Sequence, residues 1–167
     1  MCQTTAAQAS RKAPKNVTLD VKRAAAQHHR AVLARYRHDL RDASSQERQE
    51  IESVGVPADQ VVRLLDLTGL NRVDLESITG LSQEAINDHL AGGHPFKGDA
   101  GLAILGLIDT INALEAVTEN AGQNGQPISP ERLASAWLQT PHPALAGERP
   151  ATLLRTAAGR EHALRLL

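Results

Sequence analysis

The residues of this chain best suited to chemistry are its seven histidines and its single cysteine. Zinc sites need three or four such side chains at recognised spacings. His28 and His29 are adjacent, so their rings diverge on a helix, and His89 and His94 flank a Gly-Gly turn. None of these spacings is typical of zinc. We therefore expect no metal site and no cofactor.

The motifs of common enzymes are also missing from the sequence. It has no glycine-rich phosphate loop and no nucleophile elbow, and Cys2 stands at the N-terminus, where chains fray. The carboxylates are scattered among arginines on segments predicted to be helical, which is typical of solvated faces. We predict no catalytic residue and no enzymatic activity.

Composition favours packed helices. Tyr36, Phe96 and Trp137 are the only aromatic residues, so a core must be built from Leu, Ala, Ile and Val. Sheets favour aromatic and β-branched residues, whereas Leu and Ala favour helices. We predict an all-α fold. No apolar run approaches the roughly 20 residues that span a bilayer, and the N-terminus has no apolar signal segment, so we expect a cytoplasmic protein without a membrane partner.

Turn residues divide the chain into four predicted segments. These are a disordered lead (1–16), a basic helical extension (17–56), a helical domain (57–120) and a C-terminal domain (121–167). Within the third segment, glycines at 69, 80 and 92–93 are placed to stop three short helices, and Asn71 and Ser82 to cap two of them. Val62 and Val73 are expected on their inner faces. A buried helix follows from Leu102 to Val117, and Ser129 is expected to cap the helix after it.

Charge is unevenly distributed along the chain. Residues 11–41 carry nine Lys or Arg and two Asp, a local net charge of +7, whereas residues 42–99 carry eleven acids and four bases, a net charge of −7. The two regions could attract each other, or the basic region could bind an anionic partner. A solvated basic helix is an equally open interpretation.

The segment from Leu75 to Leu90 has the layout of a helix-turn-helix. Gly80 forms the turn, and Ser82 begins the second helix. That helix has no Lys or Arg and carries Glu84 and Asp88, which repel phosphate. Positive charge would have to come from the N-terminal arm. The candidate DNA-binding residues are Ser82, Gln83 and Asn87 on the helix, with Arg11, Lys12 and Lys15 on the arm.

The last third of the chain carries the most specific pattern. Its only tryptophan is followed by closely spaced prolines and paired leucines, in a segment too interrupted for one long helix. The pattern comprises Ala134-Ser135-Ala136-Trp137-Leu138, Thr140-Pro141-His142-Pro143-Ala144-Leu145, Gly147, Pro150, Leu153-Leu154, Thr156 and Gly159. Prolines stiffen a loop and lower the entropy lost when a partner binds it. This segment is predicted to be an interaction surface.

These residues resemble the toxin-binding domain of the Xre/MbcA/ParS antitoxins, and the helices upstream fall where that family has them. The resemblance implies an Xre-like helix-turn-helix bundle followed by a small toxin-binding domain. The partner would be a RES-domain toxin that consumes NAD or uses it for ADP-ribosylation. Promoter DNA of the operon would be a second partner, and homodimerisation is expected for a helix-turn-helix reader of palindromes.

The residues that the resemblance and the apolar pattern together assign to toxin binding are Trp137, Leu138, Pro141, Pro143, Leu145, Arg149, Pro150, Leu153, Arg160 and Leu166. Trp137 and Leu154 are expected to be largely structural. Two alternatives stay open: a stand-alone DNA-binding regulator with a C-terminal dimerisation domain, and an orphan with neither activity.

Overall fold

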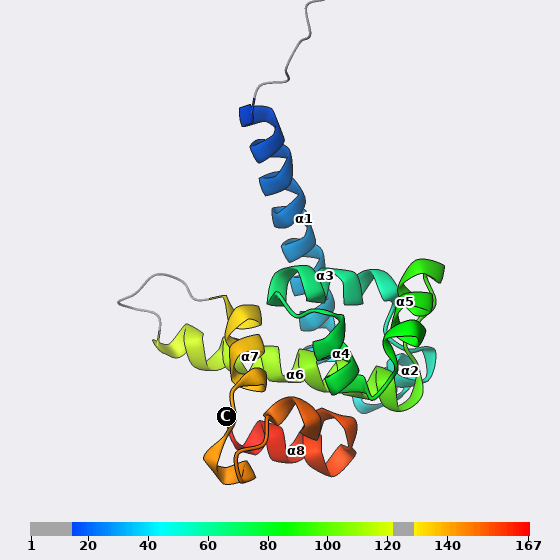
Figure 1. Cartoon of the computed structure of the whole chain (residues 1–167), viewed down its shortest axis with the longest axis vertical. Coiled ribbons are helices and arrows are strands. Elements are labelled where there is room, and N and C mark those ends of the chain that lie inside the picture. The colour runs from blue at the N-terminus through cyan, green and yellow to red at the C-terminus, as the bar shows by residue number, and fades with distance from the viewer. Residues whose placement is uncertain (1–14, 122–128) are drawn as a thin grey trace, which may run out of the picture.

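The protein is all-α in the part of the chain that the structure, a computed structural model, describes: residues 15–121 and 129–167 (Figure 1). The predicted fold class is confirmed. Most of the predicted disordered lead, with Arg11 and Lys12, lies outside the described residues. The helices are α1 (Lys15–Asp42), α2 (Ser45–Val54), α3 (Ala58–Thr68), α4 (Arg72–Thr79), α5 (Gln83–Gly92), α6 (Gly98–Ala121), α7 (Pro130–Gln139) and α8 (Ala157–Arg165), with 3₁₀ turns η1 (Pro143–Leu145) and η2 (Pro150–Arg155).

Local signals fix the ends of the short helices. Gly69, Gly80 and Gly93 end α3, α4 and α5 in the left-handed conformation, with φ of 75°, 77° and 67°. Asn71 caps α4 through its side chain, and Ser82 caps α5. These predicted boundaries are confirmed. Ser129 precedes α7 as predicted, but its side chain accepts no capping hydrogen bond, and its hydroxyl donates to Glu131 Oε2.

Helix α6 is the centre of the core. It runs across the middle of the molecule, with α3 and α4 on one side and α8 on the other (Figure 1), and Ile104, Ile108 and Ile111 on it are fully buried. The segment Gly98–Thr118 is long and apolar enough to cross a membrane by length and composition, contrary to the sequence expectation. Two-thirds of the most apolar stretch of this helix is buried inside the protein. It is therefore explained as a core helix.

Three valines predicted to face inward are on the surface instead. Val62 is 41 % exposed, Val73 56 % and Val117 55 %. Each lies at the edge of an apolar stripe whose centre is buried at Val61, Leu75 or Leu114. The helical period identifies the stripe, but how far the neighbouring helices cover its edges depends on tertiary packing.

The link before α3 and the start of α6 are joined by a pair of backbone hydrogen bonds. The Val56 amide donates to the Phe96 carbonyl, and the Phe96 amide donates to the Val56 carbonyl, each at 2.8 Å. Both side chains are fully buried. This contact fixes the N-terminal end of α6 against the rest of the core.

The second half of α1 packs into the core, whereas its first half extends away from the other helices (Figure 1). Leu33, Arg37 and Leu40 are buried, and they lie on one face at spacings of four and three. The predicted basic extension is thus a structural element from Leu33 onward.

Candidate protein-binding surface

Trp137 lies at the edge of α7, between core and solvent. The inner face of this helix is formed by Glu131, Ala134, Ser135 and Leu138, all buried. Leu138 is fully buried, so its side chain packs in the core and is not a contact residue in this conformation. Trp137 packs against that core and keeps part of its surface exposed. It can therefore both support the domain and contact a partner.

The segment after α7 is a compact loop held by its own backbone. Residue 140 is in the extended conformation that the following Pro141 favours, and the helix ends there. The His142 amide donates to the Glu148 carbonyl at 3.0 Å, and the Glu148 amide donates to the Leu145 carbonyl at 2.9 Å. Gly147, with φ of 88°, allows the chain to reverse. The loop is preformed.

This loop exposes small apolar residues. Pro141, Pro143 and Ala144 are exposed, and Leu145 is half-buried beside them. A rigid, apolar loop loses little entropy on binding, so residues 140–149 are suited to protein contact. Arg149 is exposed at the end of the loop. The predicted loop residues are thus brought together on one surface segment.

The turn η2 and helix α8 close the domain. Pro150 is buried, which removes it from the contact surface, and Leu154 is fully buried, in keeping with its expected structural role. The Gly159 amide donates to Thr156 Oγ1 at 3.0 Å, which caps α8. Leu164 is 39 % exposed, and Leu153 and Leu166 are half-buried. Part of the closing helix therefore remains available to a partner.

Arg160 was predicted to bind a partner, but it is engaged inside the protein. Its Nη1 donates to the Leu154 carbonyl at 3.1 Å, and its stem lies over Gly106 of α6, where a Cβ atom would come within 2.6 Å of Arg160 Cδ. Arg160 thus joins η2, α6 and α8. Its role in this conformation is to hold the domain together.

Sequence reasoning missed Arg155, which ties this domain to α4. Its Nε donates to the Ser77 carbonyl at 2.8 Å, and its Nη2 donates to the Glu76 carbonyl at 3.2 Å. These carbonyls lie in the last turn of α4, where the helix dipole favours a cation.

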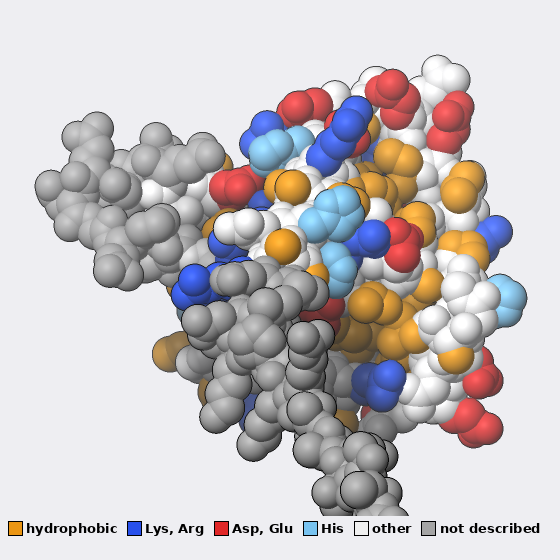
Figure 2. All heavy atoms as spheres, turned by 90° about the horizontal axis from the view of Figure 1, so that it is seen from above, with side chains coloured by type: hydrophobic (Ala, Val, Ile, Leu, Met, Phe, Trp, Pro, Cys, Tyr) orange, Lys and Arg blue, Asp and Glu red, His pale blue; other side chains and the backbone are white. Residues whose placement is uncertain are grey.

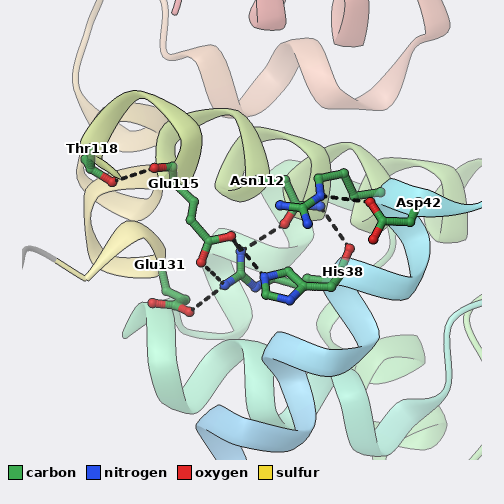
Figure 3. A network of polar contacts seen from close by, with 8 residues as sticks. His38, Asp42, Asn112, Glu115, Thr118 and Glu131 are labelled. Atoms are coloured by element: carbon green, nitrogen blue, oxygen red, sulfur yellow. Dashed lines mark hydrogen bonds and ion pairs between the residues drawn. The ribbon is translucent and has the colours of Figure 1, made fainter. Parts of the chain in front are cut away.

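A buried polar network was also missed, because its members are far apart in sequence. Arg37, 1 % exposed, donates to Asn112 Oδ1 at 2.9 Å, to Glu115 Oε1 at 3.0 Å and to Glu131 Oε1 at 3.3 Å. The side chains of Glu115, Glu131 and His38 converge from α6, α7 and α1 (Figure 3). The only sequence signal was an arginine on the apolar face that also carries Leu33 and Leu40.

This network sets the charge of Glu115. Burial alone would raise the pKa of its carboxyl, but hydrogen bonds and positive charge from Arg37 and His38 outweigh burial and hold the pKa below its usual value. The His38 ring and Glu115 Oε2 are 3.3 Å apart. Glu115 is therefore an ionised partner of Arg37 at neutral pH.

The candidate DNA-binding residues are only partly available. Ser82 Oγ accepts the Ala85 amide at 3.3 Å, and Gln83 Nε2 donates to Glu76 Oε2 at 3.1 Å. Asn87 is exposed on α5 between the acids Glu84 and Asp88. Lys15 begins α1, whose first half points away from α5 (Figure 1).

In residues 15–121 and 129–167, no three His, Cys, Asp or Glu side chains gather as a metal ion would need. Seen from above in Figure 2, the surface is a mixture of hydrophobic, acidic, basic and histidine side chains.

Residues 113–167 match the family model of the antitoxin Xre/MbcA/ParS C-terminal toxin-binding domain. The matched segment begins in α6 and contains Glu115, Glu131, Trp137, the loop and α8. A comparison with curated proteins gives no match.

Proposed function

We propose that this chain, whose residues 113–167 form a toxin-binding domain of the Xre/MbcA/ParS antitoxin family, neutralises its toxin through the surface formed by Trp137, residues 140–149 and α8. The domain supports an antitoxin role within a toxin–antitoxin system. The observation that carries the proposal is the position of the partly buried Trp137 beside a preformed apolar loop. Exposed aromatic and apolar anchors supply most of the energy of protein interfaces.

The toxin in this proposal is of the RES-domain class, and it consumes NAD or uses it for ADP-ribosylation. The support is the resemblance of the C-terminal motif to antitoxins with such partners. The antitoxin itself performs no chemistry. It covers the toxin by shape and apolar contact, and the exposed Arg149 adds one cation at the rim of the loop.

A growth assay tests this function. The full chain is co-expressed with a RES-domain toxin, and both growth and cellular NAD are measured. Leu164→Asp and Leu145→Asp place a charge on the proposed surface and are expected to abolish protection. Val73→Asp, at a position 56 % exposed on α4, is the matched control and should protect fully. Protection by both surface variants would contradict the proposal.

The alternative is a stand-alone DNA-binding regulator, favoured by the α4–Gly80–α5 layout. In this proposal Asn87 reads a base edge and the N-terminal arm supplies phosphate contacts. Promoter binding should then weaken steeply with salt and be lost on removing residues 1–22. A longer deletion, to residue 41, would also remove the buried Leu33, Arg37 and Leu40. The shorter deletion is therefore the informative one.

A further inference from the structure

The first half of α1 has no packing partner over most of its described surface. The six consecutive residues from Arg23 to His28 are all exposed, so no face of the helix is covered there. Isolated helices shorter than about 12–15 residues are marginal in water. This half of α1 therefore gains stability if another surface covers it.

The same chain carries a groove of opposite charge. It lies between the end of α1 and α2, with a volume of about 660 Å³. Its rim carries four carboxylates, from Asp39, Asp42, Glu47 and Glu50, and none of its lining residues is Lys, Arg or His. The acidic rim favours a cationic occupant.

The floor of the groove is apolar, apart from one hydroxyl group that lacks a hydrogen-bond partner. Ile51, Val54 and Pro57 line it, and Val54 is 62 % exposed. Tyr36 lies in the same lining, and its hydroxyl is buried without a hydrogen-bond partner among the described residues. Burial, with a smaller contribution from Asp59, raises the pKa of Tyr36 to about 12, so the hydroxyl keeps its proton. A buried donor without a partner is costly.

We propose that this acidic groove binds the basic first half of α1 from a second copy of the chain. Residues 15–30 of α1 carry four Lys or Arg and one Asp, which complements the four carboxylates of the rim. Tyr36, Asp39 and Asp42 of the same helix line the groove, so two copies related by a two-fold axis can exchange these contacts reciprocally, with their α1 helices antiparallel. Residues 15–30 form about 24 Å of helix at 1.5 Å per residue.

This inference is independent of toxin binding. The groove lies on α1, α2 and the link to α3, all outside the matched residues 113–167. Binding of DNA by the basic helix, in place of a second copy, leads to a different result in the experiment below.

The test is a charge exchange followed by analytical ultracentrifugation of the full chain. The native chain is expected to be a dimer that dissociates as salt is raised. Asp39→Lys with Asp42→Lys in the groove, and Lys22→Glu with Arg23→Glu on the helix, should each raise the dimer dissociation constant at least about tenfold. The four changes together should restore the native dissociation constant, because the charges are then exchanged between the helix and the groove. Glu84→Lys with Asp88→Lys on α5 changes the net charge as the groove pair does and should leave the dimer intact.

Cross-linking gives a second readout that does not depend on variants. The chain has four lysines, three of them in residues 12–22. A carbodiimide joins a lysine amine directly to a carboxylate, so a mixture of isotope-labelled and unlabelled chains should yield intermolecular links from Lys15 or Lys22 to Asp39, Asp42, Glu47 or Glu50. A monomeric native chain, or a dimer unaffected by both reversals, would overturn the proposal. The proposal would also be overturned if Lys22→Glu with Arg23→Glu abolished DNA binding and left the sedimenting mass of the dimer unchanged.

Discussion

Arg37 and Glu131 are separated by 94 residues in the sequence, and their side chains are 3.3 Å apart in the structure. Both are almost completely buried. Glu131 belongs to the matched toxin-binding segment, whereas Arg37 belongs to the N-terminal helix. One guanidinium group therefore fastens α1 to the domain that carries the candidate binding surface.

Removing this guanidinium should destabilise the whole protein. Arg37→Met leaves Glu115 and Glu131 without their shared cation, and breaking a buried ion pair on one side costs about 3–5 kcal/mol. The free energy of unfolding in urea measures the loss. Arg35→Met, at an exposed position of the same helix outside the basic first half, is the control and should change the free energy by less than about 0.5 kcal/mol. Equal effects of the two variants would show that the network has no special role.

The network should also make stability depend on acid pH. The pKa of Glu115 is lower in the folded state than in the unfolded chain. Its contribution is therefore fully present above the unfolded value of about 4.3 and is lost as pH falls through the lower folded value. Urea unfolding between pH 6 and 3 should show a smaller decrease in stability for Glu115→Gln than for the native chain. A parallel decrease in both proteins would contradict this assignment.

Gly159 should be required for the closing helix. A Cβ atom there would lie 2.1 Å from the Leu153 carbonyl oxygen, so Gly159→Ala forces η2 and α8 apart. Helix propensity alone would make this variant more stable by about 1 kcal/mol, and the steric argument predicts a loss of at least about 2 kcal/mol. Ala158→Gly, one residue earlier and exposed, should cost only the propensity difference. A lower melting temperature for Gly159→Ala checks the prediction, and stabilisation would refute it.

Arg155 should control how firmly the C-terminal domain is attached to α4. Arg155→Ala removes two solvent-exposed hydrogen bonds to carbonyls in the last turn of α4, at a cost of about 0.5–1.5 kcal/mol. Hydrogen exchange should become faster in α4 and η2 and stay unchanged in α1. Arg165→Ala on α8, whose partner Glu161 is exposed, is the matched control. Uniform acceleration over the whole chain would instead indicate global destabilisation.

Sequence patterns predicted the helices because their boundaries are coded locally. Gly80 and Asn71 act on the few residues beside them, through a positive φ or a cap hydrogen bond, and both are readable without tertiary structure. The candidate surface was located as a segment for the same reason: Pro141 and Gly147 determine the shape of the loop.

What the sequence did not reveal depends on contacts between distant segments. The network around Arg37 joins three helices, and the burial of Leu138 and Pro150 depends on how α6 and α7 pack. An apolar motif does not show which of its members face inward. Leu138, Pro150 and Arg160 are predicted to bind the toxin, although they serve the interior of the domain. The predicted division at residue 121 stays a prediction, and the family match begins earlier, at residue 113.

The most direct measurement is the affinity of the full chain for a RES-domain toxin, by calorimetry, in the native protein and in Leu164→Asp and Leu145→Asp. Loss of one interface anchor costs about 2–4 kcal/mol, so each variant should bind at least about 30-fold more weakly, while Val73→Asp binds as the native chain does. Native affinity in both surface variants, or no binding by the native chain, would contradict the assignment of Trp137, residues 140–149 and α8 as the toxin-binding surface.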